Sequence, residues 1–310
     1  MKVLLLVNPF SSSVTARTRV VIRKALAGDH DVELVETARR GHATHLAQGA
    51  AADGVDVVVA LGGDGTVNET ANGLVGTDTA LGVLPGGSTN VFARTIGLPN
   101  EPVESTAVLL EALEANSIRR VGLGSVNGRY YCFHVGIGYD AALVEQVEKW
   151  SGLKRWAGHP LFMYAGLTTW FRHYDTKHPH FKVTYSDGEH VDDGYFAVCA
   201  NTNPYTYIGN KPFDIAPEAT LDNGLAMVTV RSLRVDRILR LLVRALQGGG
   251  ALAKDPAVHY RFDAQSLVVE GLGGRPFPYQ VDGDFIGETA RLELIHVPDI
   301  MDLVMPLSPV

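Results

Sequence analysis

The sequence predicts an α/β fold with two parts, an N-terminal domain built on a parallel sheet and an antiparallel β-rich domain after it. Three observations support this prediction. Apolar, strand-like segments alternate strictly with helical ones up to residue 115, and glycine-rich turns follow several of the strands. From about Gly122 onwards, short strand-like segments are separated by Asp-Gly, Asn-Gly and Gly-Gly turns. Strict alternation of strand and helix is typical of a parallel sheet covered by helices.

The N-terminal elements follow from hydrophobic patterning. The run 55–61 is apolar and ends at glycines, as a strand buried on both faces does. The segment 104–115 has apolar residues at helical spacing. In chain order, the predicted elements are a strand over 2–7, a helix from about Thr15 that stops at Gly28, a strand over 31–36, a helix over 42–52, a strand over 55–61, a helix over 66–74, a strand over 80–84 and a helix over 104–115.

The second part contains short strands and two helices. One helix is predicted over 140–150 and the other over 236–247, where the spacing places Ile238, Leu241, Leu242 and Ala245 on the buried face. The predicted strands span 129–135, 181–186, 195–200, 226–230, 266–270 and 291–296.

The composition fits a soluble enzyme. The chain of 310 residues is long enough for two cores, and its net charge of −7 argues against general nucleic-acid binding. Two cysteines indicate a reducing compartment rather than a disulfide framework. The apolar start, 1–7, is too short for a signal peptide, and no apolar run is long enough to span a bilayer.

The most informative segment is Gly-Gly-Asp-Gly-Thr-Val-Asn-Glu at 62–69, directly after the apolar strand. Glycines there let a ligand approach the backbone amides, and the start of the following helix favours a phosphate. Asp64 would be repelled by that phosphate unless a cation lay between them, which indicates a nucleotide held with Mg²⁺. The simpler alternative is a glycine turn with an exposed aspartate.

Two further turns follow strands in the same way. Asn8-Pro9-Phe10-Ser11-Ser12 comes after the first strand, and Pro85-Gly86-Gly87-Ser88-Thr89-Asn90 after the fourth. Ligands of such folds bind beyond the carboxyl ends of the strands, so we expect the three turns to converge on one site.

Near the C-terminus, Asp282-Gly283-Asp284 places two carboxylates on either side of one glycine. A carboxylate beside a transferring phosphoryl group can accept the proton of a substrate hydroxyl. The alternative for Asp282-Gly283 is a hairpin turn, which is the favoured interpretation of that pair taken alone.

Together these motifs resemble the diacylglycerol kinase catalytic superfamily, which includes bacterial lipid kinases, sphingosine kinases and ceramide kinases. The resemblance covers nearly the whole chain and includes the stretch 216–225 as well as the ordered turns. It implies an NAD kinase/phosphofructokinase-like nucleotide domain over 1–121, to which a tail at 297–310 returns, and a β-sandwich lipid domain over 122–296. The active site would lie between them.

The resemblance also implies roles for individual residues. Asp284 falls where the family places its proton-accepting carboxylate with Asp282 beside it, and Asp64 where it organises phosphates and metal. Thr220, Asn223 and Leu225 fall at the liganding positions of a structural Mg²⁺ loop. The positions that match ATP-binding residues are Asn8, Pro9, Phe10, Ser11, Ser12, Thr37, Gly62, Gly63, Asp64, Gly65, Thr66, Val67, Asn68, Glu69, Gly87 and Ser88.

Three positions depart from the family pattern. Val91 stands where bacterial diacylglycerol kinases usually have aspartate, Asn223 replaces an anionic metal ligand, and Asp284 is one methylene shorter than the usual glutamate. The last change displaces the proposed base, and such misplacement is costly.

Three other clusters leave alternatives open. His173, His178 and His180 match no standard zinc spacing, so a polar loop is favoured over a metal site. The aromatic and basic stretch 149–172 suits either a membrane interface or core packing. Arg237, Arg240 and Arg244 share a helix face, for which simple solvation is favoured.

The sequence therefore predicts an ATP- and Mg²⁺-dependent lipid kinase that is cytoplasmic and acts peripherally at the inner membrane surface. Its partner would be a lipid substrate such as diacylglycerol or a sphingoid lipid, with no nucleic acid, no transmembrane segment and a possible homodimer. The alternatives are an NAD kinase-like enzyme and a nucleotide-binding regulator without kinase activity.

Overall fold

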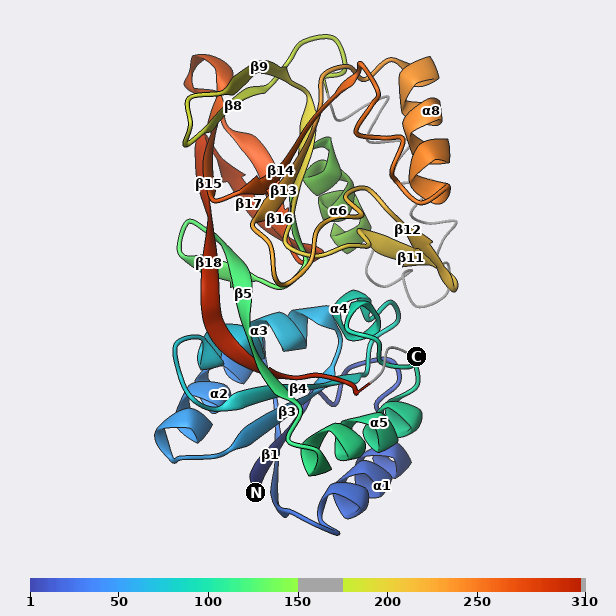
Figure 1. Ribbon diagram of the computed structural model, residues 1–310, viewed down its shortest axis with the longest axis vertical. Helices are drawn as coiled ribbons and strands as arrows, with labels where there is room; N and C mark the ends of the chain where they lie inside the picture. The colour runs from blue at the N-terminus through green and yellow to red at the C-terminus, as the bar shows by residue number, and fades with distance from the viewer. Residues whose placement is uncertain (150–174, 308–310) are drawn as a thin grey trace. The chain divides into compact units, whose positions relative to one another are not determined.

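The structure is a computed structural model that describes residues 1–149 and 175–307 (Figure 1). It divides into two compact units. Unit 1 comprises Met1–Leu123 with Val297–Val310, and unit 2 comprises Gly124–His296. The first limit lies two residues from the predicted boundary, and the second coincides with it.

Unit 1 is built on a parallel sheet with the strand order β2-β1-β3-β4. The strands are β1 (Lys2–Val7), β2 (Asp31–Glu36), β3 (Val57–Gly62) and β4 (Ala80–Pro85). The end of β18 (Arg291–Val304) joins this sheet beside β4, where Leu303 pairs with Leu81. β3 and β4 are buried along their whole lengths, as apolar strands covered on both faces must be.

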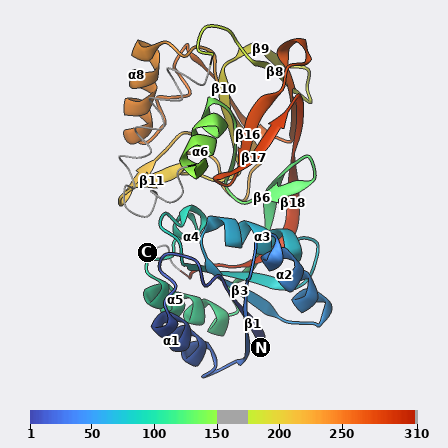
Figure 2. The same ribbon diagram turned by 180° about the vertical axis from the view of Figure 1, so that it is seen from behind.

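Five helices accompany this sheet. They are α1 (Ala16–Leu26), α2 (His42–Ala52), α3 (Asp64–Leu74), α4 (Val91–Thr95) and α5 (Pro102–Glu114). α1 packs beside α5 on one face, and α2 beside α3 on the other (Figures 1 and 2). β1, β2 and α2 have the predicted bounds. α3 begins two residues before the predicted start, because Gly63 is extended and serves as its N-cap.

Unit 2 is a β-sandwich. One layer is an antiparallel sheet of the order β14-β13-β10-β7-β16-β17, and the other contains β15, β8 and β9 beside the first part of β18. The strands are β6 (Arg129–Tyr131), β7 (His134–Gly138), β8 (Phe181–Tyr185), β9 (His190–Gly194), β10 (Phe196–Ala200), β11 (Thr206–Ile208), β12 (Lys211–Phe213), β13 (Leu225–Val230), β14 (Val258–Ala264), β15 (Ser266–Gly271), β16 (Phe277–Val281) and β17 (Asp284–Thr289). β5 (Ile118–Val126), like β18, extends across the limit between the units.

Two helices cover the outer face of the six-stranded sheet in unit 2. α6 (Tyr139–Lys149) packs on β7, β10, β16 and β17, and α8 (Val235–Leu246) packs on an apolar cluster of β10 and β13 (Figure 2). The inner face of this sheet, with residues such as Met227, packs against residues of the other layer such as Leu292 of β18, and together they form the sandwich core.

Two predictions about these elements were wrong in detail. The segment 129–135 is two strands rather than one, since the chain turns at Cys132 and Phe133, whose amides bind the Asp282 carboxylate. Leu242 of α8 is 44% exposed and does not belong to the buried face, which Leu241 and Ala245 form.

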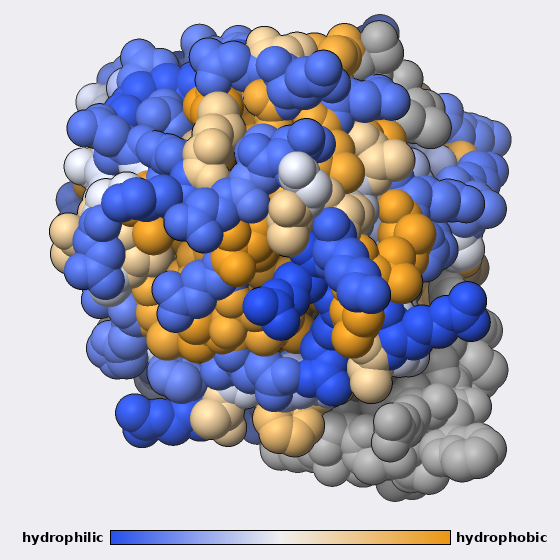
Figure 3. Space-filling view, turned by 90° about the horizontal axis from the view of Figure 1, so that it is seen from below, coloured by the Kyte–Doolittle hydropathy of each residue, from blue (hydrophilic) through white to orange (hydrophobic). Residues whose placement is uncertain are grey.

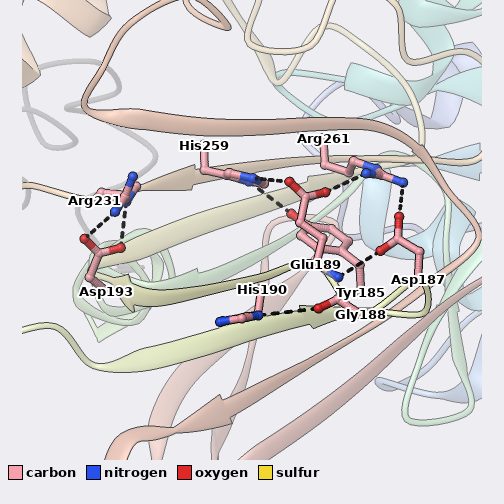
Figure 4. Close-up of polar contacts among 9 residues, drawn as sticks. All are labelled: Tyr185, Asp187, Gly188, Glu189, His190, Asp193, Arg231, His259 and Arg261. Atoms are coloured by element: carbon pink, nitrogen blue, oxygen red, sulfur yellow. Dashed lines mark hydrogen bonds and ion pairs between the residues drawn. The ribbon is translucent and has the colours of Figure 1, made fainter.

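A polar cluster ties β14 to the β8–β9 hairpin, and so joins the two sheets of the sandwich at an edge (Figure 4). The Arg261 guanidinium donates to Asp187 Oδ2 at 2.6 Å and to Glu189 Oε2 at 2.5 Å. It also lies 5.6 Å from the ring centroid of Tyr185, a cation–π contact. His259 Nε2 lies 3.0 Å from Glu189 Oε1.

Apolar residues are visible as a band among hydrophilic ones on the face drawn in Figure 3. The large hydrophobic side chains of unit 1 that are exposed include Met1, Phe10, Val20, Val21, Val103 and Leu307. The homodimer stays a prediction. Over residues 1–149 and 175–307, no helix is both long and apolar enough to cross a bilayer.

We predict that Arg261→Gln lowers the urea midpoint for unfolding of unit 2. The loss should shrink as salt is added, since exposed charges are screened. Arg231→Gln, which removes the simpler pair with Asp193, should have a smaller effect. Urea titrations followed by circular dichroism at low and high salt test this, and a loss for Arg261→Gln that salt leaves unchanged would contradict it.

Candidate functional site

The turns after β3 and β4 pack backbone against backbone. The Gly86 amide donates to the Gly62 carbonyl at 2.7 Å. A Cβ at Gly86 would lie 2.9 Å from Gly62 Cα, and one at Gly87 would lie 2.9 Å from Gly63 Cα. Side chains at these positions would therefore force the two turns apart.

The turn after β1 is joined to both. Asn8 Oδ1 accepts the Phe10 amide at 3.0 Å, and Asn8 Nδ2 donates to Thr66 Oγ1 of α3, also at 3.0 Å. The Ser13 amide donates to the Gly86 carbonyl at 2.9 Å. The sequence predicts that the turns after β1, β3 and β4 converge at one edge of the sheet. The hydrogen bonds above connect these three turns to one another.

A pocket of about 380 Å³ opens at this edge. It is lined by Asn8, Phe10, Ser11, Thr37, Arg39, Arg40, Ala43, Gly63, Gly65, Thr66 and Glu69. The start of α3, with Gly65 and Thr66, lies at this pocket with two arginines, which makes the pocket suited to an anion. A larger hollow of about 480 Å³ lies along β1 and β2 and contains none of the predicted residues.

Arg39, Arg40 and Ala43 also line the pocket but were not among the predicted residues. The available signal was a pair of adjacent arginines in the turn after β2, at the carboxyl edge of a parallel sheet. The turn after β2 therefore lines the pocket. The turn after β4 does not line it but packs against the turn after β3, which does.

Several predicted ligand contacts do not line this pocket. Val67 and Asn68 are buried in α3, and Gly62 is buried at the end of β3. The others that lie outside the lining are Pro9, Ser12, Asp64, Gly87 and Ser88.

Asp64 and Glu69 both accept backbone amides, and only Glu69 lines the pocket. Asp64 Oδ1 accepts the Phe92 amide of α4 at 3.1 Å. Val91, where the family usually has an aspartate, is buried in the first turn of α4. Glu69 accepts the amides of Gly41 at 2.8 Å and Ala43 at 3.2 Å, and so fixes the start of α2.

The residues predicted to form a structural Mg²⁺ loop do not fit that ion well. Asn223 Nδ2 donates to Thr220 Oγ1 at 3.0 Å and to the Glu218 carbonyl at 3.4 Å, and that carbonyl can only accept. The hydroxyl oxygen is thus already engaged, and Thr220, Asn223 and Leu225 supply no negative charge. Within residues 1–149 and 175–307, no three His, Cys, Asp or Glu side chains are grouped to hold a metal ion.

In unit 2, Asp282-Gly283 forms the turn of the β16–β17 hairpin, with φ of 47° and 80°. The hairpin interpretation was therefore correct. The Asp282 carboxylate is 3% exposed and accepts three backbone amides, from Cys132 at 2.7 Å, Phe133 at 3.0 Å and His134 at 3.1 Å. It fixes the turn against the start of β7.

A buried chain of hydrogen bonds supports the same turn. The Gly283 amide donates to Gln280 Oε1 at 2.8 Å, and Gln280 Nε2 donates to Asp140 Oδ2 at 2.9 Å. The Tyr205 hydroxyl donates to the other oxygen of Asp140. Burial raises the pKa of Asp140, although these two hydrogen bonds oppose the rise. Asp284 follows the turn at the start of β17 and is half-exposed.

His134 lies beside this network. It is 4% exposed, its Nδ1 has no hydrogen-bond partner, and its ring stacks on Tyr205 with centroids 4.5 Å apart. Burial lowers the pKa of His134 to about 3. The imidazole is therefore neutral at physiological pH.

The described histidines of the 173–180 cluster form no metal site. His178 Nδ1 bonds Asp175 Oδ2 at 2.9 Å, and His180 Nε2 bonds the Asp175 carbonyl at 2.7 Å, which makes a polar loop. His173 and most of the aromatic stretch lie outside the described residues.

Both parts of the chain match known families. Residues 2–127 match the model of the diacylglycerol kinase catalytic domain, and residues 134–305 match that of the YegS C-terminal NAD kinase beta sandwich-like domain. The chain belongs to the diacylglycerol kinase catalytic-domain superfamily.

The chain is similar in sequence to members of the superfamily from several bacteria, and the aligned length differs between them. The chain is 31% identical over 250 residues to "Probable lipid kinase YegS-like" of Chromohalobacter salexigens, which covers 78% of this chain and 75% of that protein. It is 35% identical over 149 residues to the diacylglycerol kinase of Bacillus subtilis, about half of either protein (47% and 48%). A crystal structure of a diacylglycerol kinase from Bacillus anthracis shares the fold, with a TM-score of 0.70 at 22% identity over 100% of this chain and 98% of that one.

We predict that His134 makes unit 2 sensitive to acid. The folded-state pKa of His134, about 3, lies below the unfolded value of 6.5. Between these values the unfolded chain binds a proton that the folded chain does not. The free energy of unfolding is therefore unaffected by protonation of His134 above pH 6.5 and falls as the pH is lowered toward 3. The slope is about 1.4 kcal/mol per pH unit. His134→Phe keeps a ring against Tyr205 and should flatten this limb of a stability-versus-pH curve. His190→Gln, at an exposed position, should not, and equal slopes for wild type and His134→Phe would refute the assignment.

Proposed function

We propose that the chain is an ATP-dependent lipid kinase that transfers the γ-phosphate to a hydroxyl group of a membrane lipid such as diacylglycerol or a sphingoid lipid. The observation that carries the proposal is the anion-suited pocket at the carboxyl edge of the unit 1 sheet, in a chain of the diacylglycerol kinase superfamily. The names of its relatives support a lipid as acceptor. The protein would act at the cytoplasmic face of the membrane, where such lipids reside.

In this proposal the pocket of unit 1 binds the phosphates of ATP. The amides at the start of α3 and the side chains of Thr66, Ser11, Arg39 and Arg40 would stabilise the negative charge. Mg²⁺ bound with ATP commonly uses one or two protein carboxylates together with the phosphates. We assign this role to Asp64, in the first turn of α3, and the bound ion would neutralise charge on the phosphates.

The acceptor side belongs to unit 2. We propose that Asp284 accepts the proton of the lipid hydroxyl as the phosphoryl group is transferred. Asp282 acts as a positioning residue, because its carboxylate already accepts three amides and fixes the turn that precedes Asp284. No covalent intermediate on the protein is needed.

We predict that Asp284→Asn lowers phosphoryl transfer by about 10²- to 10⁴-fold without weakening ATP binding. The measurement is transfer of label from γ-labelled ATP to a total lipid extract in mixed micelles. Asp284→Glu, which retains a carboxylate, should retain transfer. Full transfer by Asp284→Asn would rule out this carboxylate as the base.

We predict that Arg39→Gln with Arg40→Gln weakens binding of ATP but not of adenosine, because the arginines face the phosphates. Calorimetric titration should show at least about a tenfold loss for ATP, a loss that salt diminishes. Arg17→Gln with Arg19→Gln, on α1 away from the pocket lining, serves as the charge-matched control. Equal losses for ATP and adenosine would contradict the assignment.

An NAD kinase remains the second candidate, since the C-terminal part matches an NAD kinase beta sandwich-like model. Formation of NADP from NAD and ATP would favour it. ATP binding without transfer to lipid or NAD would instead favour a nucleotide-binding regulator.

A further inference from the structure

α8 of unit 2 has an apolar surface wider than the sheet beneath it can cover. At about 3.6 residues per turn, Leu241 and Ala245 point to the sheet and are buried. The neighbouring arc of the helix is also aliphatic, yet it is exposed. It consists of Val235 (56% exposed), Leu239 (58%), Leu242 (44%) and Val243 (52%). We call these four residues the α8 aliphatic arc.

Arginines border the aliphatic arc. Arg237, Arg240 and Arg244 follow one another at intervals of three and four residues, so they form a row along one side of the helix. With Arg234 immediately before the helix and Asp236 in its first turn, the segment 234–246 carries a net charge of +3, from four arginines and one aspartate. The whole chain, in contrast, has a net charge of −7.

The arginine row is held in place by a buried carboxylate. Asp255 Oδ2 pairs with Arg240 Nε at 2.9 Å and with Arg244 Nη1 at 2.5 Å, and its side chain has no exposure. Arg244 Nη1 also donates to the Ala251 carbonyl at 3.1 Å. One carboxylate between two guanidinium groups leaves a net positive charge beside the arc. Among the described residues, Arg237 makes no ion pair.

The four aliphatic side chains lie next to one another on one helix, and a contiguous exposed apolar patch is typical of an interaction surface. A second copy of the chain, docked through the same face, would bring one arginine row toward another, and like charges oppose that contact. An anionic lipid surface satisfies both features at once. Aliphatic side chains enter the acyl boundary while arginines reach the headgroup phosphates.

We propose that α8 is the membrane-docking element of unit 2, which inserts the aliphatic arc into the surface of an anionic bilayer. The inference rests on the proposed function in one respect, since a kinase whose acceptor is a membrane lipid must reach the bilayer. Docking through α8 would bring unit 2, and with it the Asp284 turn, to the surface from which the acceptor is taken.

The test is sedimentation of the full-length protein with vesicles of phosphatidylcholine alone or with added phosphatidylglycerol. Wild type should bind the anionic vesicles, and Leu239→Ser with Val243→Ser should weaken binding by about tenfold or more, since two large apolar side chains no longer insert. Val20→Ser, an equally exposed aliphatic residue of α1, should bind as wild type does. Undiminished binding by the double variant would overturn the proposal.

A labelled cysteine reports insertion directly. Both native cysteines are buried, so Leu239→Cys can carry an environment-sensitive fluorophore. Its emission should shift to the blue with anionic vesicles and not with phosphatidylcholine alone. An unchanged emission, or a fall in oligomer mass on Leu239→Ser with Val243→Ser, would show that the arc serves another contact.

Kinase assays separate this proposal from the proposed function. The double variant should keep its transfer rate with lipid in mixed micelles but lose it on anionic vesicles. No transfer by wild type in either setting would count against the lipid kinase alone, since vesicle binding would still decide the role of α8.

Discussion

The contact between two glycine pairs is the constraint on which the unit 1 site depends. Gly86 and Gly87 lie against Gly62 and Gly63 so closely that a Cβ on either would come within 2.9 Å of the opposite backbone. The contact fixes where β3 ends and where α3 begins. The glycine contact therefore determines that the start of α3 lies at the pocket. Glycines are needed at these positions for two reasons. They allow the two turns to pack against each other, and they leave room for a ligand.

In unit 2 the corresponding constraint is electrostatic. Asp282 gathers three amides at the start of β7, and Gln280 links the next amide of the turn to the buried Asp140. Gly136 must be glycine, since a Cβ there would lie 1.6 Å from an Asp140 oxygen. A turn held from two sides is a rigid platform for Asp284, and rigid placement matters most for a proton acceptor. In both units, backbone amides help to set the geometry: the Gly86 amide pairs with the Gly62 carbonyl in unit 1, and three amides pair with the Asp282 carboxylate in unit 2.

The sequence predicted the fold class, the sheet of unit 1 and the turns at its carboxyl edge, because buried parallel strands and glycine turns leave strong local signals. Interactions between residues far apart in the chain could not be predicted from the sequence. Nothing local shows that Asp282 binds the amide of Cys132, 150 residues earlier, or that Glu69 fixes the start of α2. Leu242 was assigned to the buried face because helical periodicity shows that a side is apolar but not how much of it a neighbour covers. Arg39 and Arg40 were not predicted, because the motifs that indicated a phosphate site consist of glycines and hydroxyl side chains, and the turn after β2 contains no such motif.

The central claim is that the turns of unit 1 form one triphosphate site that the glycine contact holds in shape. Titration of a non-hydrolysable ATP analogue into wild type and Gly86→Ala tests it directly, with Gly49→Ala, where a Cβ would meet open space, as the control. The account predicts that Gly86→Ala stays folded by circular dichroism and binds at least about tenfold more weakly, while Gly49→Ala binds as wild type does. Equal affinity for a folded Gly86→Ala would contradict it.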